Sequence, residues 1–167
     1  NPNHFGDLGS SGGPVSMLNN NVLRNSDLYT GAFPAEFGNA LSGVFDLKMR
    51  SGNNEHREYL AQVGANGFEF GLEGPFNKKN TSSYLFNYRY STFKIFDAIG
   101  LDLGAGALPF YQDLNFKANF PLKKNRGLSV FGIGGQNNID YYDTTRTTKN
   151  YTSLIGWMGV AGLNYHM

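Results

Sequence analysis

The feature that most constrains this chain is the alternation of apolar and polar residues in a series of short runs after residue 55. In the clearest run, Tyr84, Phe86, Tyr88 and Tyr90 occupy every second position. Successive residues of a β-strand point to opposite faces, so this spacing predicts a strand with one apolar face. Comparable runs between turn signals predict six strands, at roughly 57–66, 67–76, 82–92, 111–120, 128–138 and 152–166.

Composition supports a mainly β fold and argues against several classes of function. Of the 167 residues, 22 are Gly, 14 are Phe and 10 are Tyr, a mixture typical of strands joined by turns. The net charge of +1 argues against a nucleic-acid partner, because such a surface needs a basic excess. The absence of cysteine excludes disulfides and thiolate metal sites.

Alternation fits two architectures. In a soluble sandwich the apolar faces form the core, whereas in an outer-membrane barrel they meet lipid and the polar faces line the lumen. The sequence contains no apolar stretch of about 18 residues, which excludes a transmembrane helix. Strands of a membrane barrel need only about 9–11 alternating residues, so they remain compatible with this sequence.

The connections favour the barrel. Residues 77–80 and 121–126 predict short, charged turns, and residues 93–110 and 139–151 predict long loops, while the first connection, at 65–67, is tight. Outer-membrane barrels alternate short periplasmic turns with longer extracellular loops. Aromatic residues near the predicted strand ends suit the interfacial girdles of such a barrel; they are Tyr90, Phe93, Phe110, Tyr111 and Phe120.

Residues 1–54 differ in composition from the rest of the chain, because they are rich in Gly, Ser, Asn and Pro. They predict loops, short strands at about 15–18, 26–30 and 44–50, and a single helical turn at 19–23. Residues 32–43 predict a loop. We therefore expect two parts, residues 1–54 and residues 55–167.

Residues 26–48 carry a pattern of glycines and aromatics that resembles the end of the plug domain in TonB-dependent outer-membrane receptors. The matching positions form a plug motif of seven residues: Gly31, Pro34, Phe37, Gly38, Gly43, Val44 and Lys48. The family's usual Tyr is Phe37 here, and its usual Asn-Ile pair after Gly-Val is Phe45-Asp46. The 33–36 insert resembles the subgroup with a carboxypeptidase-regulatory-like N-terminal extension, and 72–76 and 83–91 resemble its first periplasmic turn and third strand.

The resemblance implies a plugged transmembrane antiparallel β-barrel. Residues 1–54 would be the C-terminal part of the plug, and residues 55–167 about six strands of a barrel of about 22. It further implies the outer membrane of a Gram-negative bacterium, energised uptake of a nutrient, and no enzymatic activity. The implied partners are the remainder of the barrel, the TonB complex, membrane lipid and, as in some relatives, a surface lipoprotein lid or other outer-membrane chains. Both ends of the chain suggest a piece of a longer protein.

Combined with strand parity, the barrel interpretation assigns side chains to two environments. The residues expected to face the lumen are Glu69, Glu73, Asn87, Arg89, Asp113 and Lys117. The residues expected to face lipid are Phe68, Phe70, Tyr84, Phe86, Tyr88, Leu114, Phe116 and Trp157. The glycines Gly31, Gly38 and Gly43 are expected to permit tight turns and close backbone approach inside the barrel.

The sequence gives little support for a metal site, a nucleotide-binding site or a catalytic site. His4 lies near Asp7, but the three histidines lack metal-ligand spacing, and we expect His4 to be a surface or packed residue. Asp140 and Asp143 lie outside any calcium-loop pattern. The glycine clusters lack a phosphate-binding spacing, and no nucleophile-elbow motif is present. We therefore expect no catalytic residues, no metal site and no cofactor.

Three functions remain open on the sequence. The first is energised nutrient uptake by a TonB-dependent transporter. The second is a structural or secretion-associated outer-membrane protein that reuses the plug and barrel. The third is a soluble β-sandwich that binds a ligand or sugar.

Overall fold

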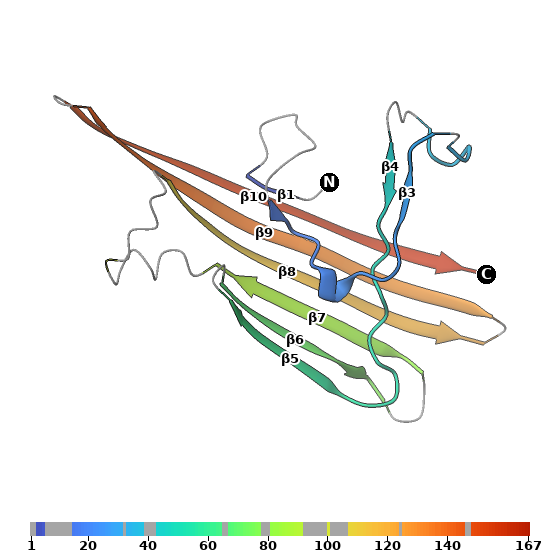
Figure 1. Cartoon of the computed structure of the whole chain (residues 1–167). Coiled ribbons are helices and arrows are strands. Elements are labelled where there is room, and N and C mark those ends of the chain that lie inside the picture. The colour runs from blue at the N-terminus through green and yellow to red at the C-terminus, as the bar shows by residue number, and fades with distance from the viewer. Residues whose placement is uncertain are drawn as a thin grey trace.

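The computed structural model describes residues 3–5, 15–31, 33–38, 43–64, 67–77, 81–91, 100, 107–123, 125–145 and 148–167. For residues 107–109, 141–145 and 148–151 it describes the backbone alone. The prediction of a mainly β protein is confirmed, and the central element is an antiparallel sheet (Figure 1). In this part of the chain, no helix is long and apolar enough to cross a membrane.

The sheet has six strands, and each strand pairs with its neighbours in sequence. The spatial order is β10-β9-β8-β7-β6-β5. The strands are β5 (Glu58–Gly64), β6 (Gly67–Pro75), β7 (Ser83–Tyr90), β8 (Ala107–Leu122), β9 (Arg126–Thr145) and β10 (Thr148–His166). Consecutive antiparallel pairing needs only hairpin connections, which is why turn residues separate the alternating runs in the sequence.

One predicted connection is wrong. Residues 139–151 were expected to form a long loop, but β9 continues to Thr145 and β10 begins at Thr148, in register from Thr148–Thr145 to His166–Gly127. β8 likewise begins at Ala107, earlier than the predicted residue 111. Residues 140–151 are rich in Asp, Tyr and Thr, so they lack the apolar alternation by which the rest of β9 and β10 was located. Residues 93–99 and 101–106 of the other predicted loop lie outside the described residues.

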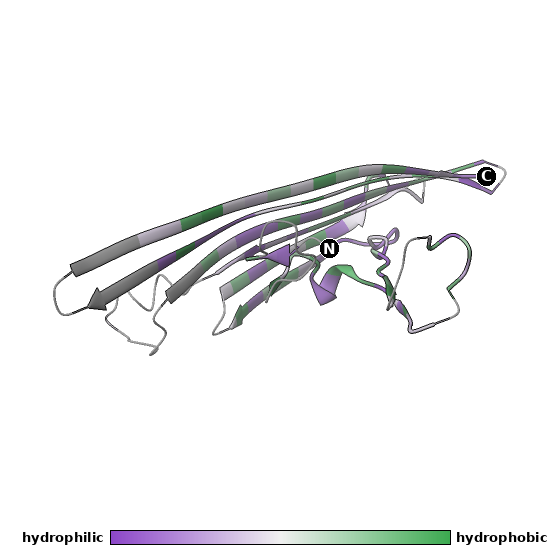
Figure 2. Cartoon of the chain, turned by 90° about the horizontal axis from the view of Figure 1, so that it is seen from above, coloured by the Kyte–Doolittle hydropathy of each residue, from purple (hydrophilic) through white to green (hydrophobic). Residues whose placement is uncertain are grey.

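The N-terminal part forms short elements that lie across the concave side of the curved sheet (Figures 1 and 2). They are β1 (Asn3–His4), β2 (Val15–Ser16), the 3₁₀ turn η1 (Asn20–Val22), β3 (Asp27–Tyr29) and β4 (Val44–Asp46). β1 pairs with β2 and β3 with β4, both antiparallel. An isolated bridge between Leu23 and Met49 continues the second pair toward the sheet.

Across β6, β7 and β8, the two faces of the sheet have opposite chemistry and opposite exposure. Directly paired residues of antiparallel strands share a face, so the register places Glu69, Arg89 and Asp113 together. This face meets the N-terminal elements, and we call it the covered face. Phe70, Tyr88 and Leu114 lie together on the other face, which we call the apolar face.

Large side chains on the apolar face are exposed. Trp157 keeps 85% of its surface exposed and Val63 keeps 90%, whereas Asp113 keeps 1%. The large hydrophobic residues buried in the described part of the chain are few, and two of them, Met17 and Val22, belong to the N-terminal segment. The usual distribution of a soluble protein, with polar groups outside and apolar groups inside, is therefore reversed across this sheet.

The chain passes from the N-terminal part to the sheet at Gly52, which is packed against the backbone of β7. A Cβ added at Gly52 would lie 2.0 Å from the carbonyl oxygen of Tyr84, whereas at Gly31 and Gly38 no described atom comes within 4 Å of one. At Gly43 the nearest contact is the Tyr29 oxygen at 3.4 Å. The close approach expected at the motif glycines is therefore found at Gly52.

We predict that Gly52→Ala destabilises the protein by about 1–3 kcal/mol or more, because the clashing atom is backbone and cannot rotate away. The matched control is Gly38→Ala, which adds the same methyl group where no described atom lies within 4 Å and should change stability by less than about 0.5 kcal/mol. Denaturant midpoints followed by circular dichroism would test this, and equal midpoints for the two variants would contradict it.

Candidate functional site

The contacts between the N-terminal segment and the covered face form a continuous polar interface. It contains carboxylates, guanidinium groups and carboxamides from β6, β7 and β8, and they bind side chains and backbone carbonyls of the N-terminal segment. Buried polar groups are costly without partners, so these contacts determine how the two parts fit together.

Asp113 is at the centre of the interface. Arg89 donates to its two carboxylate oxygens, from Nε at 3.0 Å and from Nη2 at 2.7 Å. Nε2 of His4 lies 3.0 Å from the Asp113 Oδ2 atom, and both side chains are fully buried. Arg89 Nη2 also donates to the backbone oxygen of Ser16 at 2.5 Å. Asp113 can remain buried because strand β7 and the N-terminal segment each supply it with a partner.

A second group consists of carboxamides around Glu69. Asn87 and Asn21 each donate from Nδ2 to Glu69 Oε1 at 2.7 Å. Asn19 Nδ2 donates to Asn87 Oδ1 at 3.3 Å, and Asn21 Nδ2 also donates to Gln62 Oε1 at 3.0 Å. The group therefore connects η1 with β5, β6 and β7.

Local sequence explains how η1 presents these asparagines. Asn19 is the N-cap of the 3₁₀ turn and accepts a hydrogen bond from the backbone N–H of Asn21 at 3.1 Å. Met17 precedes the turn and Val22 is its last residue, and both are buried, with exposed fractions of 1% and 0%. Two apolar anchors and a cap therefore fix the orientation of a segment whose remaining side chains are polar.

The third group joins the end of the N-terminal segment to β6. The Arg50 guanidinium donates to both carboxylate oxygens of Glu73, at 2.7 and 2.6 Å, and this pair raises the pKa of Arg50. The backbone N–H of Asn53 donates to Glu73 Oε2 at 2.8 Å. A bidentate pair with a further backbone donor is a geometrically specific attachment.

Two side chains of β8 bind backbone carbonyls of the N-terminal segment directly. Asn115 Nδ2 donates to the oxygen of Met17 at 2.9 Å, and Lys117 Nζ donates to the oxygen of Met49 at 2.7 Å. Nearer the surface, Asp46 and Asp27 hold Lys48 at 2.8 and 3.0 Å and keep the pKa of its ammonium group above the ordinary value.

All the residues predicted to face a lumen lie on the covered face. They are Glu69, Glu73, Asn87, Arg89, Asp113 and Lys117. All the residues predicted to face lipid lie on the apolar face. They are Phe68, Phe70, Tyr84, Phe86, Tyr88, Leu114, Phe116 and Trp157.

The plug motif lies at some distance from this interface in the fold. Val44 belongs to β4 and pairs with Tyr29 of β3, whose ring lies 5.4 Å from that of Phe37. Pro34 accepts a hydrogen bond from the backbone of Phe37 at 3.0 Å. Among the seven motif residues, Lys48 is the one that forms an ion pair, with the carboxylates of Asp46 and Asp27.

Several residues of the interface were missed by sequence reasoning. Asn19, Asn21 and Asn115 carry no local signal for their contacts across the interface, because those partners lie far away in the sequence. His4 was expected to be a surface or packed residue, and it is packed. The buried Nδ1 atom of His4 and the Oδ1 atom of Asn115 have no partner within the described residues.

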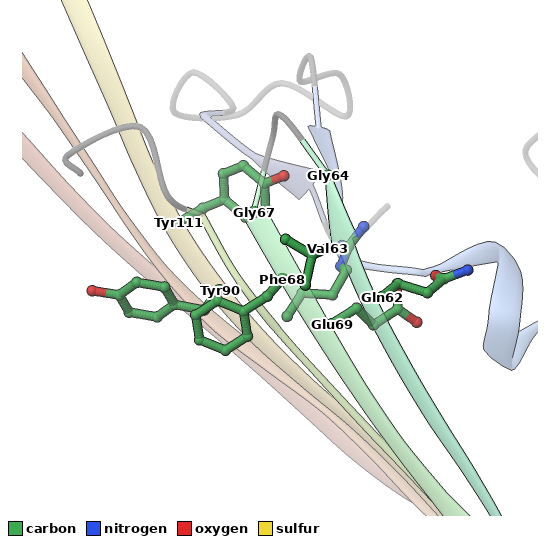
Figure 3. Close-up of a pocket in the computed structure, with 9 residues that line it drawn as sticks. Gln62, Val63, Gly64, Gly67, Phe68, Glu69, Tyr90 and Tyr111 are labelled. Atoms are coloured by element: carbon green, nitrogen blue, oxygen red, sulfur yellow. The ribbon is translucent and has the colours of Figure 1, made fainter. Parts of the chain in front are cut away.

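A concavity of about 560 Å³ opens at the Gly64–Gly67 end of the sheet (Figure 3). Gln62 and Glu69 point toward η1, while the stacked rings of Phe68 and Tyr90 lie on the other side of the strands. Within the described part of the chain, no three His, Cys, Asp or Glu side chains gather as metal ligands would. The site is therefore an interface held by ion pairs and amides.

Comparison with protein-family models, with curated proteins and with solved structures found no match to this chain. The arrangement of its own residues therefore carries the functional argument.

We predict that Arg50→Met loosens the end of the N-terminal segment, because it leaves the mostly buried Glu73 carboxylate without its cation. Removing one partner of a fully buried pair costs about 3–5 kcal/mol, and the cost here is smaller because Arg50 is partly exposed. Amide hydrogen exchange should become faster in residues 44–54. Lys48→Met removes a more exposed cation and should cost less than about 1 kcal/mol. Equal exchange in the two variants would show that the Arg50–Glu73 pair does not hold the segment.

Proposed function

We propose that this chain is part of a TonB-dependent outer-membrane transporter that takes up a nutrient. The N-terminal segment is the end of its plug, and β5–β10 are the first strands of its barrel. The observation that carries the proposal is the reversed polarity of the sheet. A soluble sandwich would bury the apolar face and leave the polar face wet, whereas here the polar face is covered and the apolar face is open.

The aromatic side chains at the two ends of the apolar face support the interpretation that this face forms a membrane-embedded apolar band. At one end the rings of Phe68 and Tyr90 stack, with their centroids 5.2 Å apart, and Trp157 lies in the same row. At the other end Phe76 stacks on Phe120 with centroids 5.4 Å apart. These two aromatic rows match the girdles that flank the apolar band of outer-membrane barrels.

The separation of the two aromatic rows also fits the height of the apolar band in membrane barrels. On β10, Trp157 lies in one row and Tyr165 in the other, eight residues further along. At about 3.3 Å per residue, the distance along the strand is roughly 26 Å. A strand tilt of about 40° reduces the height to roughly 20 Å, close to the band of about 25 Å in membrane barrels.

Polar side chains mark the upper boundary on the apolar face. Tyr88 donates from its hydroxyl to Gln112 at 2.9 Å, and Gln112 donates to Gln136 at 3.3 Å. β8, β9 and β10 continue past this row. Strands that extend beyond the apolar band are consistent with an extracellular extension of the barrel wall.

The edges of the sheet supply a further argument. Within the described sheet, β5 and β10 each pair on one side. Open edges are not tolerated in lipid, so a membrane protein must pair them with further strands. The proposal therefore assigns the remainder of the same barrel as the partner of both edges.

Membrane placement is tested with single spin labels, which is simple because the chain has no cysteine. The matched pair is Leu163→Cys on the apolar face and Met158→Cys on the opposite face of β10. In the full protein in lipid bilayers, we expect the label at residue 163 to collide with oxygen and to be shielded from a water-soluble nickel complex. The label at residue 158 should show the reverse. A label at 163 that is shielded from both reagents would indicate a sandwich and overturn the proposal.

Transport is tested separately in cells. We expect a strain that lacks the gene, and a strain that lacks TonB, to lose growth on the same nutrient. Normal growth on every nutrient, together with loss of a surface complex, would favour a structural or secretion-associated role.

A further inference from the structure

Lys117 is an exception among the cations of the polar interface. Arg50 and Arg89 each bind a carboxylate, as described above. Lys117 is half-buried, and its one hydrogen-bond partner among the described residues is the backbone oxygen of Met49. An ammonium group has three donors and loses hydration on burial, so a carbonyl alone leaves the Lys117 charge uncompensated.

A second cation makes the imbalance larger. Arg24 belongs to the N-terminal segment and lines the same concavity as Lys117. Among the described residues, neither side chain forms an ion pair. Two like charges that face one concavity without an acid are the arrangement that an anion would stabilise.

The concavity between them has the size and lining of a small-molecule site. It has a volume of about 300 Å³ and lies between the N-terminal segment and β8–β10. Its lining contains no aspartate or glutamate, and Lys48, the third cation there, is already neutralised by Asp46 and Asp27. Leu47, Phe131 and Ile133 supply an apolar wall, while Ser129 and Asn164 supply polar groups. Apolar walls with a few convergent polar groups are typical of ligand sites.

We propose that this concavity binds a small organic anion that carries a carboxylate on an apolar group. The carboxylate accepts hydrogen bonds from Lys117 Nζ and from the Arg24 guanidinium, which can bind it in a bidentate manner. The apolar group packs against Leu47, Phe131 and Ile133. This site goes beyond the proposed function, because it uses contacts within this chain and does not depend on a membrane location.

The probes are benzoate and benzamide, which have the same shape and differ in charge. Isothermal titration calorimetry on the full protein at low ionic strength should show binding of benzoate, weakened by added salt, and little binding of benzamide. Lys117→Met should weaken benzoate binding about tenfold or more, because it removes a charged hydrogen-bond donor. Lys117→Arg should restore most of the affinity.

The control variant is Lys123→Met, which removes an exposed cation outside the concavity and should leave benzoate binding unchanged. Equal binding of benzoate and benzamide, or an equal loss in the Lys117 and Lys123 variants, would overturn the proposal. Absence of benzoate binding to the unmodified protein would also overturn it, since an acid from another part of the protein would then compensate Lys117. None of these outcomes bears on the spin-label test of membrane placement.

Discussion

The structure depends on the requirement that a buried charge must have a partner. Asp113 is almost fully buried, and it is stable there because Arg89 and His4 both contact its carboxylate. One partner comes from the neighbouring strand and the other from a residue 109 positions earlier. The same principle applies to Glu69 and Glu73, so the position of the N-terminal segment follows from charges and amides fixed on three strands.

Strand register ties this polar interface to the apolar face. Because alternate residues of a strand point to opposite faces, a slip of one position would place Asp113 among Phe70 and Tyr88 and would move Leu114 against the N-terminal segment. The contacts that hold the segment and the exposure of the aromatic side chains are therefore two results of one register. A polar interface also differs from an apolar core, because water can replace its hydrogen bonds at a low net free-energy cost. Under the proposed function, this property suits a segment that has to move inside a barrel.

The sequence predicted the parts of the fold that repeat a local pattern. Alternation located all six strands, and the parity of Tyr84–Tyr90 and of Phe116 agrees with the face on which these side chains lie. The ends of β9 and β10 were missed, because polar residues at successive positions remove the alternation that marks a strand. The six side chains that were expected to face a lumen lie on the covered face, but their partners were not predicted. Pairs such as Arg50–Glu73 and Asn115–Met17 bring together distant positions, and a single sequence holds no signal for such contacts.

The separation of these contacts along the chain has a consequence for folding. Each strand of the sheet pairs with the strand next to it in sequence, so the sheet can grow by adding one hairpin after another. The N-terminal segment is made first, yet Ser16, Met17 and His4 find their partners 73, 98 and 109 residues later. Before β8 is in place, His4, Met17 and Met49 lack the side chains that bind them in the folded structure, namely Asp113, Asn115 and Lys117. We therefore expect the segment to remain solvated through early assembly. It should dock in a late step, after β8 has paired with β7.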